Sequence, residues 1–139
     1  MVVRIIGGIL RILIIDDDKS STDLMRVLLS TYPAEVHITN NPSEGIELAR
    51  QIRPGLILLD QCMPEMDGKQ VCQVIRKTSS TPILILSAAD TPDMIASILD
   101  AGADDFLEKP VSREMLFAYI NKLTRYHKTG PLLSIPSVV

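Results

Sequence analysis

The stretch LILLDQCMPEMDG (residues 56–68) decides the fold that this sequence predicts. Its first four residues, 56–59, are all aliphatic, which is typical of a parallel strand buried on both faces. Asp60 follows at once, and Pro64 and Gly68 are turn residues that predict a loop. A buried strand that ends on a carboxylate predicts an α/β protein whose chemistry lies at the carboxyl ends of its strands.

Strand and helix patterns alternate on both sides of this stretch. Aliphatic or alternating segments predict strands, which we place at residues 12–15, 35–39, 56–59, 83–86 and 103–108. Apolar residues at helical spacing, together with capping residues, predict helices, which we place around residues 20–32, 42–53, 71–75, 92–101 and 113–126. Five such units imply a doubly wound α/β fold, a three-layer sandwich with a five-stranded parallel sheet between helices.

The composition excludes several classes of protein. The chain has 139 residues, enough for one domain, and its 46% hydrophobic content excludes intrinsic disorder. The net charge of −3 and the 4% aromatic content argue against direct nucleic-acid binding and against an anionic membrane surface. Two cysteines, Cys62 and Cys72, form neither a disulfide framework nor a zinc spacing, so we expect a reducing, cytoplasmic location.

The ends of the chain differ from its middle. Residues 2–15 are apolar but are interrupted by Arg4 and Arg11, so they predict neither a membrane-spanning helix nor a signal peptide. We expect an N-terminal extension at residues 1–10, a folded domain at 11–126, and a tail or linker stub at 127–139, where the periodicity stops. Either a stand-alone protein or a fragment of a longer chain fits this pattern.

Polar side chains with related chemistry follow the predicted buried strands. Asp16 and Asp17 come after the first strand, Asp60 after the third, Ser87 after the fourth and Lys109 after the fifth. Because the carboxyl ends of parallel strands meet at one edge of a sheet, we expect one crevice to contain them all. Clustered carboxylates without His or Cys favour Mg²⁺, and a carboxylate nucleophile beside a lysine and a hydroxyl suits phosphoryl transfer.

The order of these residues resembles the receiver domain of two-component response regulators. The carriers of the resemblance are the acid pair Asp16-Asp17, the D-x-x-M-P-x-M-D-G motif at residues 60–68, Ser87-Ala88 and Lys109-Pro110. It covers roughly residues 11–125, and it implies a chemotaxis-regulator-like, flavodoxin-like sheet with strand order 2-1-3-4-5 and a cis Lys109–Pro110 bond.

The resemblance also implies the role of each site residue. Asp60 is then the phosphoacceptor, and Mg²⁺ is bound by Asp16, Asp17 and Asp60 together with the backbone carbonyl of Cys62. Asp16 acts partly through a water molecule.

Two further residues complete the implied chemistry, and Phe106 fills an aromatic switch position. Ser87 hydrogen-bonds the phosphoryl oxygens and acts as a switch residue, and Lys109 pairs with the phosphate.

The resemblance further implies partners and an output. A sensor histidine kinase or phosphotransfer protein donates the phosphoryl group, and the added charge switches the surface formed by the fourth helix, fifth strand and fifth helix, roughly residues 91–126. A downstream effector domain or protein reads that surface, which is also a possible homodimer contact. The domain is then not an enzyme with a separate substrate, since it assists only its own phosphorylation and dephosphorylation.

Some residues have simpler interpretations or depart from the family pattern. Asp60 itself fits a turn cap and Ser87 an ordinary strand end, while Phe106 fits both core and switch. Asp18, a third consecutive acid, is better explained as a helix cap than as a ligand. Val111 stands where the family commonly has an aromatic residue.

Two other functions stay under consideration. A haloacid-dehalogenase-like phosphatase would use Asp16 and Asp18, but the chain is too short for a cap domain and the loop at 60–68 is left unexplained. A flavodoxin-like electron carrier is disfavoured because three aspartates, at residues 16–18, would repel a flavin phosphate.

Overall fold

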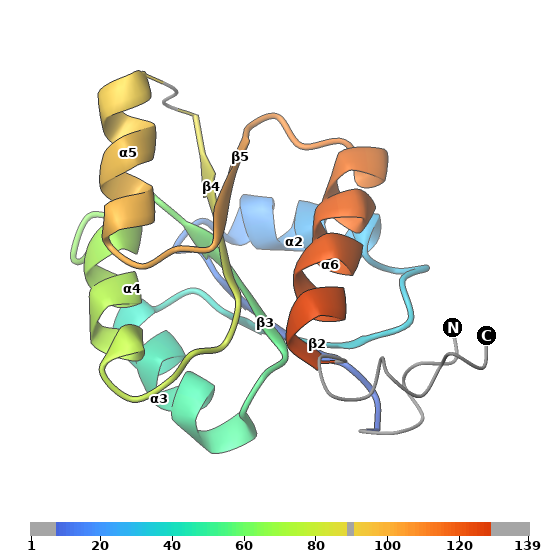
Figure 1. Ribbon diagram of the computed structural model, residues 1–139. Coiled ribbons are helices and arrows are strands. Elements are labelled where there is room, and N and C mark those ends of the chain that lie inside the picture. Colours follow the sequence, from blue (N-terminus) through green and yellow to red (C-terminus); the bar gives the residue numbers. More distant parts are fainter. Residues whose placement is uncertain (1–7, 89–90, 129–139) are drawn as a thin grey trace.

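The computed structural model describes residues 8–88 and 91–128, with side chains described as far as residue 125. Strands and helices alternate through this part of the chain (Figure 1). The strands are β1 (Arg11–Ile15), β2 (Glu35–Thr39), β3 (Leu56–Asp60), β4 (Ile83–Ser87) and β5 (Asp105–Glu108). The helices are α2 (Lys19–Leu28), α3 (Pro42–Ile52), α4 (Gly68–Arg76), α5 (Pro92–Asp100) and α6 (Arg113–Lys128).

The strands form one parallel sheet in the order β2-β1-β3-β4-β5, as predicted. Helices α2 and α6 cover one face of this sheet, and α3, α4 and α5 cover the other (Figure 1). The sheet order reverses direction next to β1, which places a crevice at the carboxyl ends of β1 and β3. The doubly wound three-layer fold predicted from the sequence is therefore confirmed.

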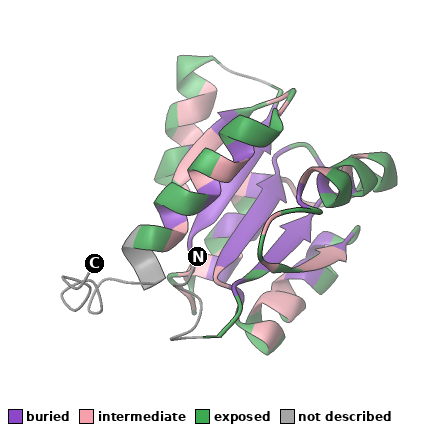
Figure 2. Ribbon diagram, turned by 90° about the vertical axis from the view of Figure 1, so that its right-hand side faces the viewer, coloured by how far each residue is buried: buried purple, intermediate pink, exposed green. Residues whose placement is uncertain are grey.

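The central strand β3 explains why its sequence is apolar without alternation. Leu56 and Leu58 pack into the core beneath α2 and α6, whereas Ile57 and Leu59 pack into the core beneath α3, α4 and α5. All four side chains are fully buried. The central strands β3 and β4 are buried along their whole length, whereas the edge strands β2 and β5 are only partly buried and the helices expose their outer faces (Figure 2). A strand with a helical layer on each side has no solvent-facing row, so every position is apolar.

Most helix ends follow the predicted local signals. Asn41 caps α3, and its side chain accepts a 2.9 Å hydrogen bond from the Glu44 backbone N–H. Thr91 caps α5, Ser112 accepts a bond from the Met115 backbone N–H before α6, and Gly102 ends α5 in the left-handed region. The Lys109–Pro110 peptide bond is cis, as the resemblance implied.

Helix α2 is shorter than predicted, and the structure selects one of its two apolar stripes. It ends at Leu28, whereas the apolar spacing had suggested a helix as far as residue 32. Met25 and Leu29 form the buried stripe, while the Leu24 side chain is 57% exposed. Two adjacent apolar stripes satisfy the same 3.6-residue period, so periodicity alone did not select the one that faces the sheet.

Smaller differences lie at three other boundaries. Strand β4 includes Ser87, β5 begins at Asp105 rather than at residue 103, and α6 continues to Lys128. The expectations for the terminal segments at residues 1–7 and 129–139 lie outside the described residues. Among the helices that the structure describes, none has both the length and the apolar character that crossing a lipid bilayer requires.

Helix α3 approaches β1 closely at Gly45. A Cβ atom at this position would lie 2.7 Å from Cδ1 and 2.8 Å from Cγ1 of Ile15, a fully buried side chain. Alanine favours a helix over glycine by about 1 kcal/mol, but overpacking a core costs about 1–3 kcal/mol. We expect the packing cost to dominate here, because Ile15 is fully buried and three of its side-chain atoms lie within 3.0 Å of the added Cβ.

We therefore expect Gly45→Ala to lower the free energy of unfolding by about 1–2 kcal/mol, measured by urea denaturation. Gln51→Ala, an exposed substitution on the same helix, is the control and should change it by less than about 0.5 kcal/mol. If the Gly45→Ala protein were as stable as the parent, the close approach of α3 to β1 at Gly45 would be contradicted.

Candidate functional site

Three carboxylates gather where β1 and β3 end. Because Ile15 pairs with Leu59 in the sheet, the next residues, Asp16 and Asp60, leave neighbouring strands side by side. One carboxylate oxygen from each of Asp16, Asp17 and Asp60 lies within 4.8 Å of the others. Asp16 and Asp60 are 4% and 5% exposed, whereas Asp17 is exposed. The structure thus brings together the three acids that the sequence placed at this edge.

Lys109 reaches this cluster from the end of β5. Its Nζ lies 2.6 Å from Oδ1 of Asp60 and 3.8 Å from Oδ2 of Asp16. The Lys109 backbone N–H donates a 2.9 Å hydrogen bond to the carbonyl of Ser87, which holds the end of β5 against β4. The cluster therefore contains three carboxylates and one ammonium group, which leaves an excess of negative charge at this edge of the sheet.

Burial and mutual repulsion change the acidity of these groups. Burial raises the pKa of Asp16 to about 6, and the charge of Asp60 adds to this shift, while the Asp18 backbone N–H opposes it. Burial also raises the pKa of Asp60, against the opposing effect of Lys109. Burial acts to lower the pKa of Lys109, but the hydrogen bond and the charge of Asp60 outweigh it and raise that pKa. The acids are thus incompletely neutralised by the lysine alone.

This donor set fits Mg²⁺. The three grouped side chains are all carboxylates, and hard carboxylate oxygens are the ligands that Mg²⁺ prefers. Burial is the main cause of the raised Asp16 pKa, and a bound cation would offset both this desolvation and the repulsion by Asp60. The backbone N–H of Cys62 acts on the Asp60 carboxylate, so the loop after β3 folds back beside this cluster. The role of the Cys62 carbonyl as a further ligand stays a prediction.

Asp18 takes no part in the cluster. Its carboxylate caps α2 by accepting hydrogen bonds from the Ser20 backbone N–H at 3.2 Å and from the Ser21 hydroxyl at 2.9 Å. The capping role predicted for this third acid is confirmed. The phosphatase alternative needs Asp16 and Asp18 to act together, and this geometry does not favour it.

The two predicted switch residues lie on the strands beside the cluster. Ser87 is 1% exposed at the end of β4, one residue beyond Leu86, which pairs with Asp60. Phe106 lies in the middle of β5 beside Ile85 and packs, half-buried, against the core beneath α3, α4 and α5. Ser87 and Phe106 lie on β4 and β5, the two strands between the carboxylate cluster and the edge of the sheet. Their roles as switches remain predictions.

Sequence reasoning missed the supporting role of two residues at the site. The side chain of Asn40 donates hydrogen bonds to the Asp16 carbonyl at 2.8 Å and to the Thr22 hydroxyl at 3.2 Å. Gly68 was predicted as a turn residue and as the last residue of the motif at 60–68, but without the reason for a glycine, which is that a Cβ there would lie 2.7 Å from the Asp60 carbonyl oxygen. Glycine is required because α4 begins directly against the backbone of the acceptor strand. An Asn directly after β2 and the Asp-Gly pair of the loop were the available signals.

Comparison with known proteins agrees with this geometry. The family profile described as response regulator receiver domain matches residues 12–121. The chain belongs to this family. Response regulator MprA of Mycobacterium leprae is 40% identical to this receiver domain over 120 residues, which are 86% of this chain and 53% of that protein. DNA-binding response regulator MtrA of Mycolicibacterium smegmatis is 35% identical over 131 residues, 92% of this chain and 57% of that protein.

Solved structures give the same result. The receiver domain of the Francisella response regulator 1452 superposes with a TM-score of 0.80 at 28% identity, covering 85% of this chain and 98% of that one. Chemotaxis protein CheY4 of Vibrio cholerae superposes with a TM-score of 0.79 at 26% identity, covering 84% and 99%. The chain spans about half the length of the curated relatives it matches.

The burial of Asp16, together with the repulsion by Asp60, raises the pKa of Asp16 and predicts a specific dependence of stability on pH. Since the folded Asp16 carboxyl titrates at about 6 and the unfolded one near 3.8, the folded state binds more protons between these values. Metal-free protein should therefore be more stable at pH 5 than at pH 7.5, and Mg²⁺ should raise the melting temperature more at pH 7.5. Differential scanning calorimetry at both pH values, with Mg²⁺ or with EDTA, measures this.

The variant Asp16→Asn tests the cause of this effect. It keeps the oxygen that accepts from the Asp18 backbone N–H but removes one charge, so it should raise the melting temperature in EDTA at pH 7.5 by roughly 3–6 °C. It should also reduce the stabilisation by Mg²⁺. Asp23→Asn, an exposed acid on α2, is the control and should change neither quantity. A melting temperature of Asp16→Asn that is equal to or below the parent's would contradict an electrostatic penalty on the buried Asp16 carboxylate.

Proposed function

We propose that this receiver domain accepts a phosphoryl group on Asp60 from the phosphohistidine of a sensor histidine kinase or phosphotransfer protein. The observation that supports this most directly is the buried Asp60 carboxylate, which shares a crevice with Asp16 and Asp17 while Lys109 contacts one of its oxygens at 2.6 Å. In the transfer, a carboxylate oxygen of Asp60 forms a bond to phosphorus, the phosphorus–nitrogen bond breaks, and the imidazole leaves.

The residues of the crevice divide this work among them. Asp16, Asp17 and Asp60 would hold Mg²⁺ together with the Cys62 carbonyl, and the ion supplies charge neutralisation to the incoming phosphoryl oxygens. Lys109 orients the Asp60 carboxylate before transfer and then pairs with the phosphate. The Ser87 hydroxyl donates to a phosphoryl oxygen. The domain acts as a signalling phosphoacceptor that assists only its own phosphorylation and dephosphorylation.

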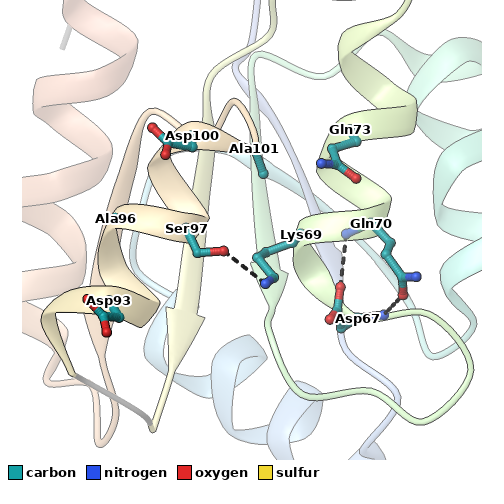
Figure 3. Close-up of a pocket in the computed structure, with 9 residues that line it drawn as sticks. All are labelled: Asp67, Lys69, Gln70, Gln73, Asp93, Ala96, Ser97, Asp100 and Ala101. Atoms are coloured by element: carbon teal, nitrogen blue, oxygen red, sulfur yellow. Dashed lines mark hydrogen bonds between the residues drawn. The ribbon is translucent and has the colours of Figure 1, made fainter.

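The phosphorylated site is expected to change the surface formed by α5, β5 and α6. Ser87 is the last residue of β4 and Lys109 directly follows β5, so movement of either toward a phosphate would act on the strand that carries Phe106. A second connection runs through α4, which follows the acceptor loop: the Lys69 ammonium donates a 2.9 Å hydrogen bond to the Ser97 hydroxyl on α5 (Figure 3). A downstream effector, or a second copy of the domain, would read the changed surface in the cytoplasm.

Phosphorylation at Asp60 is tested with acetyl phosphate and Mg²⁺. Intact-protein mass spectrometry should detect one added phosphoryl group on the parent and on Asp23→Asn, but not on Asp60→Asn, since an amide oxygen is a poor nucleophile and forms no acyl phosphate. EDTA should abolish the uptake. Labelling of Asp60→Asn at the rate of the parent would overturn the assignment of the acceptor.

The role of Ser87 is tested separately from phosphorylation. Ser87→Ala should still take up one phosphoryl group, yet phosphorylation should no longer change amide hydrogen exchange in α5, β5 and α6, because the variant lacks the hydroxyl that links β4 to the phosphate. Ser87→Thr keeps a hydroxyl and should restore the change. If exchange in Ser87→Ala responds to phosphorylation as in the parent, Ser87 is an ordinary strand end.

A further inference from the structure

A second hollow lies at the opposite end of the sheet from Asp60. It is formed by the C-terminal half of α3, the end of α4 and the loop at residues 77–82, and its volume is about 830 Å³. This volume lies in the range of sites for small organic ligands. The hollow opens beside the starts of β3 and β4, one strand length away from the carboxylate cluster.

The chemistry of the hollow combines apolar side chains with cations. Ile46, Val74 and Ile75 are among its apolar lining residues, and Arg50, Arg53 and Lys77 supply positive charge. No acidic residue lines it, although the whole chain carries a net charge of −3.

These cations are poorly paired within the protein. Among the described residues, Arg53 and Lys77 form no ion pair, and Arg50 has only a 3.9 Å contact with Glu47 on its own helix. All three side chains belong to exposed residues, so an incoming anion meets them without breaking a strong internal contact.

A neighbouring groove shows that this distribution of charge is local. The groove between α4 and α5 has a volume of about 640 Å³ and is lined by Asp67, Asp93 and Asp100 as well as Lys69 (Figure 3). There the lysine donates to Ser97 and acids predominate, so that groove offers no net positive charge. An anion should therefore bind in the hollow beside α3 in preference to the groove between α4 and α5.

The wall formed by the loop is held in place before any ligand arrives. The guanidinium of Arg76 donates to the Thr81 carbonyl at 2.7 Å and to the Gly102 carbonyl at 2.9 Å, and it pairs with Asp104 at 2.7 Å. The Ser79 hydroxyl donates to the Thr81 hydroxyl at 2.9 Å. A wall fixed by these bonds loses little conformational entropy on binding.

The backbone of Arg53 adopts a conformation that favours glycine. Its φ of 49° lies in the left-handed region, where glycine is unstrained and a larger side chain costs on the order of 1 kcal/mol. Cations near the ends of α3 and α4 interact favourably with the helix dipoles, which accounts for basic residues in general. The helix dipoles do not explain why an arginine occupies a strained position, nor why apolar side chains line the hollow between the cations.

We propose that this hollow binds a small organic anion that has an apolar body and a phosphate, phosphonate or carboxylate group. The apolar body would lie on the side chains of Ile46, Val74 and Ile75, and Arg53 and Lys77 would pair with the anionic group. The site is independent of the proposed phosphorylation of Asp60, because none of its lining residues belongs to the carboxylate cluster.

The test uses phenylphosphonate, whose carbon–phosphorus bond prevents transfer to Asp60, in EDTA and with ¹⁵N-labelled protein. We expect saturable chemical-shift changes centred on residues 46–53 and 74–82. Benzyl alcohol, which lacks the charge, and inorganic phosphate, which lacks the ring, should each bind at least about fivefold more weakly. Equal binding of either probe, or shifts centred on another part of the protein, would overturn the proposal.

Two variants with a matched control complete the experiment. Arg53→Gly removes the charge and the backbone strain together, so it should fold at least as stably as the parent while weakening phenylphosphonate binding at least about fivefold. Lys77→Gln should weaken binding in the same direction. Arg26→Gln removes the same charge from exposed α2 and should change binding less than about twofold. Unchanged affinity in Arg53→Gly and Lys77→Gln would show that no anion pairs with these cations.

Discussion

The burial of carboxylates that also repel one another, at one edge of the sheet, is the constraint on which the site depends. Asp16 and Asp60 are almost fully buried, and one oxygen of each lies within 4.8 Å of an oxygen of Asp17. Burial and mutual charge raise the pKa of Asp16 to about 6, which means that the fold holds these groups against an electrostatic penalty. Lys109 offsets only part of that penalty, and this is the condition under which a divalent cation binds well.

The remainder of the fold supplies the rigidity that such a cluster needs. Strand β3 is enclosed on both faces, and β1 and β4 fix its register from either side. Asn40 holds the backbone of Asp16, and Gly68 lets α4 begin against the carbonyl of Asp60. Charged groups that repel one another stay close only when the backbone around them has no alternative arrangement of similar energy. The aliphatic core is thus part of the explanation of the site.

Much of this arrangement was predictable from local patterns. The apolar runs at β1, β3 and β4 indicated strands with two covered faces, and the acids, the serine and the lysine that follow them indicated one crevice. Asn41, Thr91 and Gly102 marked helix ends through interactions with their own neighbours in sequence. At α2 the spacing left two apolar stripes open, and only the sheet decided that Met25 rather than Leu24 is buried.

The sequence by itself determined the order of strands and helices, the parallel sheet and the residues that reach its functional edge, because these follow from periodicity and from caps within a few residues. Only the tertiary structure decided that Lys109 contacts Asp60, that Asn40 holds the backbone carbonyl of Asp16, and that Arg53 borders an apolar hollow. Distances, burial and acidity depend on groups that lie far apart along the chain. Their effect on one another arises only when packing removes the water between them.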